Sequence, residues 1–142
     1  MEIRVKTLDE SGRLPEKKTK GAAGADLYAA SDEIIYPKTT GKIKTGIAIE
    51  VPEGYVGLIF ARSSMATRDG LAPANKVGII DSDYRGEVIV PLYNQSSIAA
   101  YVHTGQRIAQ LIIVPVLDVE YKKSRTLSKT KRGDKGFGST GL

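Results

Sequence analysis

The chain consists of short apolar segments separated by breaks that contain Gly and Pro. Within several segments apolar and polar residues alternate and β-branched residues are frequent, which is typical of strands with one buried face. One further stretch, residues 63–71, has apolar residues at helical spacing and predicts a short helix. The predicted strands are residues 43–51, 55–60, 87–93, 99–102 and 107–116.

The breaks leave little room for long helices. The sequence contains 15 Gly and 6 Pro, and these residues interrupt regular structure. We therefore expect an all-β sandwich or barrel with one short helix. With 142 residues, 41% of them hydrophobic, the chain is long enough for one domain with one core and too short for two.

Composition excludes several classes of function. The longest apolar run, residues 111–117, contains Pro115 and is far shorter than the roughly 20 residues that span a bilayer. The absence of Cys excludes disulfides, thiolate nucleophiles and zinc fingers, and the single histidine excludes a multi-histidine metal site. The first residues lack the apolar stretch of a secretory signal. We expect a cytoplasmic protein, or a nuclear or organellar one if the source is eukaryotic or viral.

Charge predicts an anionic partner. The formal net charge is +5 at pH 7, which suits nucleic acids and membranes as well as nucleotides and other phosphate esters. Residues 13–20 and 122–135 are rich in Lys and Arg and poor in apolar residues. We expect a loop at the first segment and an arm at the second, which divides the chain into a core of residues 1–121 and an arm of residues 122–142.

The end of the sequence has a composition suited to polyphosphate. Residues 132–142 hold four Gly, two cations, two hydroxyls and Phe137, so backbone N–H groups can approach oxygens while the ring stacks on a base. A Walker A loop is excluded, because Ser139 stands where that motif needs Lys and no helix follows. Taken alone, the segment fits a flexible Gly-rich tail at least as well.

Two internal motifs could carry chemistry. Arg62, Ser63 and Ser64 stand where a predicted strand meets the predicted helix, a place for binding an anion or for ordinary helix capping. Asp81 ends an apolar run and precedes a turn and Tyr84, so its carboxylate could act as a general base. The alternative is that Asp81 is a turn former.

A fourth motif lies in the last predicted strand. Alternation places Arg107, Ala109 and Leu111 on one face and Ile108 and Gln110 on the other. A glutamine among apolar neighbours needs a hydrogen-bond partner.

Taken in order, these segments resemble the five motifs of the trimeric deoxyuridine triphosphatase (dUTPase) family. The resemblance runs from about Leu8 to Leu142, nearly the whole chain. The matching segments are residues 23–28 (AGADLY), 62–64 (RSS), 78–86 (GIIDSDYRG), 105–111 (GQRIAQL) and 132–141 (RGDKGFGSTG).

The resemblance implies a fold and an activity. Members are jelly-roll subunits that form homotrimers, exchange C-terminal arms and build each active site from more than one subunit. They hydrolyse dUTP to dUMP and pyrophosphate with Mg²⁺, by attack of water on the α-phosphorus. The reaction limits uracil in DNA and supplies dUMP for dTTP synthesis, and it requires neither a membrane nor nucleic acid.

The resemblance also implies roles for individual residues. Asp81 would be the base that activates water, Tyr84 would pack on the deoxyribose, and Asp26 would reach the metal through water. Uracil would lie in a tight hairpin formed by residues 75–89 and contact Asn75, Gly78, Ile79, Ile80 and Ile89. The phosphates would be bound by Arg62, Ser63, Ser64 and Gln110 and by the arm residues Arg132, Gly138 and Ser139, with Phe137 over the base.

Two departures from the family pattern leave alternatives open. Ala61 and Ser64 stand where the family commonly has Pro and Gly. Arg-Ser-Ser also occurs in dCTP deaminases, which share the fold and in some members also hydrolyse the nucleotide. A nucleotide-binding regulator with this fold is a third reading.

Overall fold

Alternation along the strands produces the buried faces expected from the sequence. In the strand β8 (Glu87–Asn94), Val88, Val90 and Leu92 are buried, whereas Ile89 and Tyr93, which point to the other face, are exposed. The same period gives β5 (Tyr55–Phe60) an inward face with Gly57 and Ile59. These faces meet in one apolar core.

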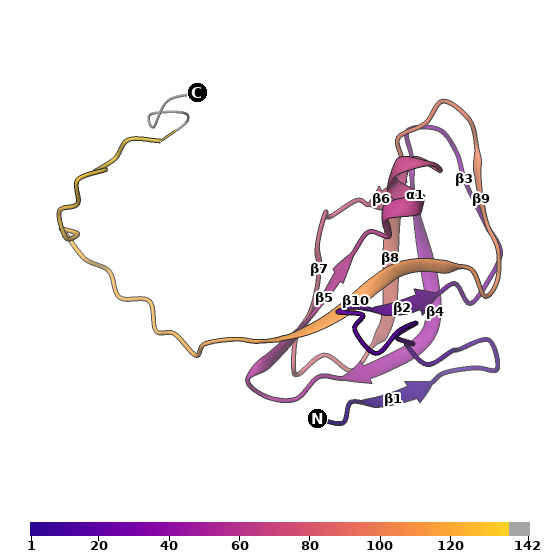
Figure 1. Cartoon of the computed structure of the whole chain (residues 1–142), viewed down its shortest axis with the longest axis horizontal. Helices are drawn as coiled ribbons and strands as arrows, with labels where there is room; N and C mark the ends of the chain where they lie inside the picture. The colour runs from indigo at the N-terminus through magenta and orange to yellow at the C-terminus, as the bar shows by residue number, and fades with distance from the viewer. Residues whose placement is uncertain (137–142) are drawn as a thin grey trace.

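The computed structural model describes residues 1–136 and consists of two four-stranded antiparallel sheets and a two-stranded ribbon (Figure 1). The first sheet has the order β1-β4-β8-β6, the second β2-β10-β5-β7, and the ribbon pairs β3 with β9. The elements other than β5 and β8 are β1 (Arg4–Thr7), β2 (Ala25–Tyr28), β3 (Glu33–Ile35), β4 (Thr40–Glu50), α1 (Ser63–Thr67), β6 (Leu71–Pro73), β7 (Gly78–Ile80), β9 (Ala100–Val102) and β10 (Arg107–Pro115). This jelly-roll-like sandwich confirms the predicted all-β class.

The helix is shorter than its sequence spacing predicts. α1 ends at Thr67, because Gly70 adopts a left-handed φ of 66° and Leu71 enters β6 with its side chain buried. Left-handed backbone is accessible to glycine without steric cost and ends a helix. Across residues 1–136 α1 is the sole helix, and its five residues are too few to cross a membrane.

Strand β10 departs from strict alternation. Its pairing with β2 shifts register between Arg107 and Ala109, so Ile108 and Ala109 are both buried although they are neighbours. A β-bulge of this kind turns successive side chains to the same side. The predicted division of residues 107–111 between two faces is therefore wrong at the start of the strand.

Residues 75–89 do not form a two-stranded hairpin. β7 pairs with β5, whereas the next strand, β8, pairs with β4 and β6 in the other sheet. The chain turns at residues 81–84, where the N–H of Tyr84 donates to the carbonyl of Asp81 at 3.2 Å. The segment therefore connects the two sheets, and the hairpin expected from sequence is corrected to a crossing loop.

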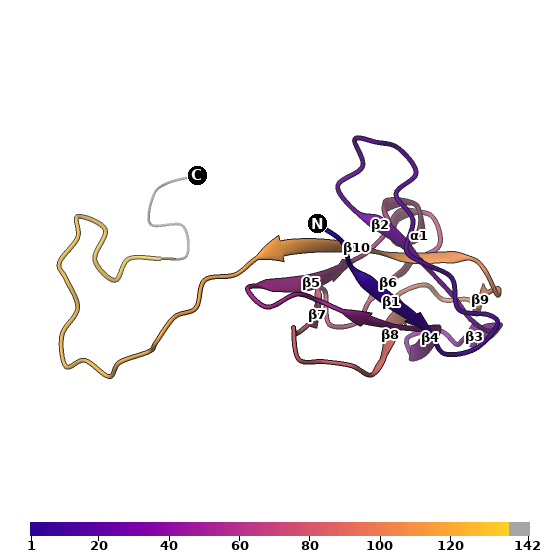
Figure 2. The ribbon, with the colours of Figure 1, turned by 90° about the horizontal axis from the view of Figure 1, so that it is seen from below.

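After β10 the chain leaves the body of the molecule. Residues 116–136 contain no helix or strand and extend away from the sheets (Figures 1 and 2). Val116, Leu117 and Val119 are exposed there. The last strand thus ends at Pro115, a few residues before the boundary predicted for the arm.

Candidate active site

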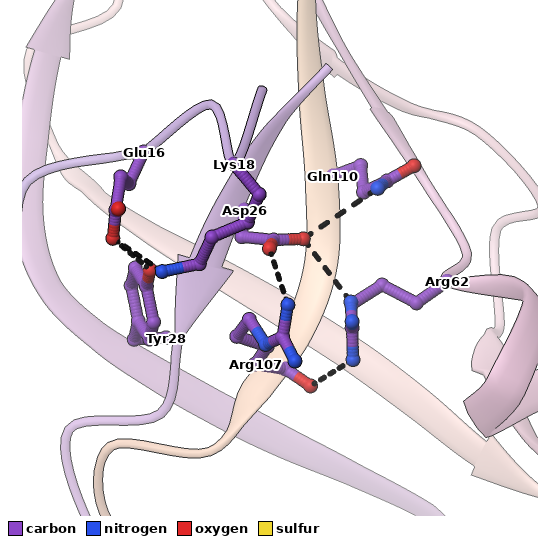
Figure 3. A network of polar contacts seen from close by, with 7 residues as sticks. All are labelled: Glu16, Lys18, Asp26, Tyr28, Arg62, Arg107 and Gln110. Atoms are coloured by element: carbon purple, nitrogen blue, oxygen red, sulfur yellow. Dashed lines mark hydrogen bonds and ion pairs between the residues drawn. The ribbon is translucent and has the colours of Figure 1, made fainter. Parts of the chain in front are cut away.

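A carboxylate surrounded by cations lies on β2. Asp26 is only 3% exposed, and its two oxygens face two arginines (Figure 3). Oδ1 accepts from Nε of Arg62 at 3.1 Å and Oδ2 from Nη1 of Arg107 at 3.1 Å. Nε2 of Gln110 lies 3.5 Å from Oδ1. We call Asp26 and the three residues that contact it the Asp26 cluster; the three are Arg62, Arg107 and Gln110.

Strand register explains how the cluster forms. Gln110 on β10 lies opposite Asp26 on β2 and opposite Phe60 on β5. Arg62 follows β5 directly, and Nη1 of its guanidinium lies 3.4 Å from the carbonyl of Arg107. The bulge in β10 allows Arg107 and Gln110, an odd number of residues apart, to reach the same carboxylate. The hydrogen-bond partner expected for Gln110 is therefore Asp26.

The cluster leaves Asp26 little capacity for a metal ion. An ionised carboxylate offers about four acceptor positions, and three donors already occupy Asp26. One position remains, and it can accept a hydrogen bond from a water molecule. In the described residues no group of three or more His, Cys, Asp or Glu side chains gathers as a metal site.

Ser63 and Ser64 open α1. The N-cap residue is Arg62, with extended backbone, and no side chain hydrogen-bonds at this cap. The capping role that the sequence left open is therefore not observed for these serines. Ser64 lines a cavity of about 640 Å³ together with Arg62 and Arg107.

The 13–20 loop packs beside the cluster. Glu16 bridges Lys18 and Tyr28, accepting from Nζ at 2.6 Å and from the phenol at 2.9 Å. These hydrogen bonds, the one from Lys18 first, hold the pKa of Glu16 below its ordinary value. The Arg13 guanidinium lies 4.1 Å from the centre of the Tyr28 ring, a cation–π distance.

Asp81 and Tyr84 occupy the loop between the sheets, and both are exposed. The Tyr84 hydroxyl donates to the carbonyl of Glu87 at 2.9 Å. A Cβ on Gly86 would lie 2.6 Å from Cζ of Tyr84, so the missing side chain of Gly86 makes room for the ring. The amide nitrogen of Asn75 lies 3.5 Å from the position that a Cβ on Gly78 would take.

The candidate residues of one subunit fall into two groups. Ile80 pairs with Gly57 near the start of β5, whereas Arg62 lies beyond the other end of that strand. About six residues of β5 separate the level of Asp81 from Arg62, about 20 Å at roughly 3.3 Å per residue. The structure brings Asp26, Arg62, Ser63, Ser64 and Gln110 together at one end of β5. Because β7 runs antiparallel to β5, Gly78 pairs with Ile59 near that same end, with Asn75 beside it, whereas Ile79 pairs with Leu58 and Ile80 with Gly57. Asp81 and Tyr84 follow β7 beyond the other end, and Ile89 lies opposite Lys44 in the other sheet.

Of the arm residues named from the sequence, Arg132 lies in the segment after β10 that contains no helix or strand. Nε of Arg132 donates to the carbonyl of Lys135 at 2.9 Å, within the arm itself. Phe137, Gly138 and Ser139 lie outside the described residues.

Several residues around the cluster were not singled out from sequence. Arg107 was placed on the wrong face of its strand, and Tyr28, Glu16 and Arg13 received no role. The sequence held one signal for Tyr28: it stands two positions after Asp26, and side chains at that spacing lie on the same face of a strand.

On a jelly-roll-like sandwich, the described residues gather cations around one buried carboxylate and carry a second carboxylate on a loop. Such an arrangement suits proteins that bind phosphate esters. The dUTPase family profile matches residues 10–141, and the chain belongs to that family.

Individual relatives agree along the whole length. A deoxyuridine 5'-triphosphate nucleotidohydrolase of Hydrogenobaculum sp. (strain Y04AAS1) is 46% identical and covers 100% of this chain and 99% of its own. The dUTPase of Staphylococcus bacteriophage 80alpha, solved with dUPNHPP, superimposes with a TM-score of 0.93 at 31% identity and 99% coverage of both chains. A mutant of the dUTPase from phage phi11 of S. aureus, whose structure describes the coordination of a structural Mg(II) ion, has a TM-score of 0.83 at 28% identity, covering 89% of this chain and 98% of its own.

Proposed function

We propose that this chain hydrolyses dUTP to dUMP and pyrophosphate. The observation that carries the proposal is the Asp26 cluster, which orients Arg62 and Gln110 at the end of β5, where Arg62 and Ser64 line one cavity. Guanidinium groups at fixed positions are suited to phosphate oxygens. The curated relative named as a dUTP nucleotidohydrolase supports the choice of substrate. The activity would limit uracil in DNA and supply dUMP for dTTP synthesis.

The active site is assembled from several subunits. Asp81 and Arg62 of one chain lie about 20 Å apart along β5. At that distance Asp81 could not reach the α-phosphorus of a nucleotide whose phosphates are bound by Arg62 of the same chain. A homotrimer that places the Asp81 loop of one subunit against the Asp26 cluster of another removes this distance. The arm, residues 122–142, then closes the site from a third subunit.

The loop selects the base and sugar. The Asn75 amide presents both a donor and an acceptor to uracil, helped by backbone groups at Gly78, Ile79, Ile80 and Ile89. The ring of Tyr84 lies under the deoxyribose and leaves no room for a 2′-hydroxyl. The hydrogen bond from the Tyr84 hydroxyl to the carbonyl of Glu87 holds the ring against the loop, which supports this role.

Asp81 takes the proton from the attacking water. Because the same loop binds uracil, the carboxylate reaches the near end of the triphosphate, the α-phosphorus. Pyrophosphate leaves as its growing charge is stabilised by Arg62, Ser63, Ser64, Gln110 and Arg132. The arm residues Phe137, Gly138 and Ser139 complete the set of groups around the nucleotide.

The residues fit Mg²⁺ bound through the substrate. Mg²⁺ keeps several waters and is commonly held by phosphate oxygens with one or two carboxylates. The single open acceptor position of Asp26 fits a metal-bound water. When bound, the ion neutralises charge on the phosphates.

A substrate panel tests the proposal. With Mg²⁺ present, dUTP should yield dUMP and pyrophosphate, while dCTP, UTP and dTTP should not. Asp81→Asn should abolish turnover yet still bind dUTP. Release of ammonia from dCTP would instead identify a deaminase, and tight dUTP binding without pyrophosphate release by the wild type would identify a regulator.

A further inference from the structure

The positive charge of the chain lies in the arm. Residues 122–142 contain seven Lys and Arg and one Asp, whereas residues 1–121 contain 14 Lys and Arg and 15 Asp and Glu. The formal net charge is therefore +6 on the arm and −1 on the core. An anionic partner that is attracted by net charge is consequently attracted to the arm and not to the core.

Most of this charge precedes the arm residues assigned to the nucleotide. Residues 122–131 contain five cations and no Asp or Glu. The phosphate-binding role proposed above begins at Arg132, so these five side chains have no place in the hydrolytic steps. We call residues 121–131 the basic segment. Its cations are Lys122, Lys123, Arg125, Lys129 and Lys131.

The basic segment is open to solvent. All of its residues are exposed, and it extends away from the sheets without helix or strand (Figures 1 and 2). Within residues 1–136, Lys122 is the only one of its cations in an ion pair, 3.4 Å from Glu120, and both side chains are 78% exposed. Because a pair so exposed contributes little, the cations of the segment remain available to a ligand.

An aromatic ring stands at the start of the basic segment. Tyr121 is 92% exposed and directly precedes Lys122 and Lys123. Proteins that bind single-stranded nucleic acid combine cations along the phosphate backbone with aromatic side chains on which unpaired bases stack. The bases of a duplex are already stacked on one another, so an exposed ring beside cations favours a single strand.

The length of the segment favours a polymeric anion. When extended, residues 121–131 span at most about 40 Å, and the cations are spread along that length. A small phosphate ester can meet only neighbouring cations, whereas a chain of phosphates can contact all of them. A lipid surface is less suitable, because Leu127 is the one large apolar residue among residues 122–131 and stable attachment of a polybasic segment to a membrane needs a second, apolar anchor.

We propose that the basic segment binds single-stranded nucleic acid through its cations and Tyr121. The cations contact phosphates, which carry no sequence information, and the ring stacks on a base of any kind, so binding is independent of sequence. The proposal does not rest on the hydrolysis of dUTP, and that reaction does not need the nucleic acid. In the homotrimer proposed above, three such segments bind a long strand more tightly than one. Binding concentrates the protein at exposed single strands.

Fluorescence anisotropy with a labelled oligothymidylate and the nucleotide-free protein tests the proposal. The test variant combines Lys122→Gln, Lys123→Gln, Arg125→Gln and Lys129→Gln. Each phosphate contact on a single strand adds about 0.7 to the slope of log affinity against log salt concentration. The slope should therefore fall by up to about 3 in the variant, and the affinity at about 0.1 M salt should be about tenfold weaker or more.

A second set of four substitutions is the matched control. It removes the same charge from exposed positions of the core and should bind the oligothymidylate like wild type. The changes are Lys6→Gln, Lys20→Gln, Lys42→Gln and Lys44→Gln.

Tyr121→Ala separates stacking from charge. This change should weaken binding about fivefold or more, the loss expected for one stacked base, and leave the salt slope as in wild type. Tyr101→Ala is its control, because Tyr101 is another exposed tyrosine, in β9, and should bind like wild type.

Three outcomes would overturn the proposal. The first is equal oligothymidylate affinity in wild type and the four-residue arm variant, which should share one circular dichroism spectrum because the segment contains no helix or strand. The second is loss of binding on truncation after Lys131, which keeps the basic segment and should retain most of the affinity. The third is binding of wild type to phosphatidylserine vesicles without affinity for the oligothymidylate, which would identify a membrane as the partner.

Discussion

At the scale of single residues, the buried carboxylate of Asp26 is the feature on which most other contacts depend. Its charge compensates two guanidinium groups, and the exposed fractions of the Arg62 and Arg107 side chains, 18% and 42%, show that only the first pair is well shielded from solvent. Shielding strengthens an ion pair, whereas solvent weakens it. The Arg62 contact is therefore the stronger of the two.

Asp26→Asn should destabilise the fold and misplace Arg62. The amide keeps the shape but removes the charge and turns its own N–H donors toward the donors of the arginines. We expect a loss of about 2 kcal/mol, below the range for fully buried pairs because Arg107 is partly solvated. Urea unfolding measures it. Asp118→Asn, at an exposed position, is the control, and equal midpoints for Asp26→Asn and wild type would contradict the assignment.

Gly86→Ala should weaken sugar discrimination. The new Cβ would lie 2.6 Å from Cζ of Tyr84, so the ring must leave its position. The ratio of kcat/KM for dUTP to that for UTP should fall by about tenfold or more, as expected when a steric exclusion is relaxed. Gly21→Ala is the control, because no atom lies within 4 Å of that Cβ. An unchanged ratio would remove Tyr84 from sugar selection.

The sequence identified the chemistry of these residues better than their partners. The need of Gln110 for a partner followed from its apolar neighbours alone. That the partner is Asp26 depends on strands 84 residues apart and on a bulge, and neither leaves a local signal. Arg107 was misplaced for the same reason.

At the scale of elements, the 13–20 loop depends on Glu16. Its hydrogen bonds keep the Glu16 pKa below the ordinary 4.5. A carboxyl whose pKa is lower in the folded state stabilises that state above the unfolded pKa, and this contribution disappears as pH falls through the folded pKa. The loop should therefore loosen only in acid.

Glu16→Gln tests this pH dependence. The wild type should unfold at higher urea than the variant at about pH 6, and the two midpoints should converge once the pH falls below the lowered pKa of Glu16 in the folded state. Glu53→Gln serves as the control, since Glu53 is exposed in a turn. A difference between Glu16→Gln and wild type that is the same at both pH values would show that the carboxylate charge is not involved.

Truncation after Lys131 should separate assembly from catalysis. Residues 116–136 contain no helix or strand, so removing the end of the arm leaves the described core intact. We expect the trimer to persist in light scattering while activity falls by orders of magnitude, because the enclosing cations and donors are lost. Full activity in the truncated protein would show that the end of the arm does not contribute to catalysis.

Element prediction succeeded where strands are long. The 55–60 strand was predicted with its observed bounds, and the longer strands β4, β8 and β10 within a few residues. The short strands β1, β2, β3, β6 and β7 were not predicted, whereas the equally short β9 was predicted as residues 99–102. Three or four residues give little period to detect. The pairing of β7 with β5 rather than β8 is a tertiary choice that the turn residues do not encode.

At the scale of the whole molecule, complementation tests the shared site. Asp81→Asn subunits mixed with subunits truncated after Lys131 should regain activity after joint refolding. In a random equal mixture about one quarter of the sites combine an intact Asp81 with an intact arm from another subunit. Asp81→Asn mixed with a chain carrying both defects is the control and should stay inactive. No recovery in the first mixture would contradict sites shared between subunits.

The separation of Asp81 from Arg62 along β5 also has a genetic meaning. Suppose that each site needs three chains, which contribute the Asp81 loop, the Asp26 cluster and the arm. A folded chain in which all three are defective then disables every site to which it contributes. At equal gene dosage only about one eighth of the sites would then be built wholly from sound chains, if assembly is random. Such an allele would be dominant, whereas an allele whose product fails to fold would be recessive.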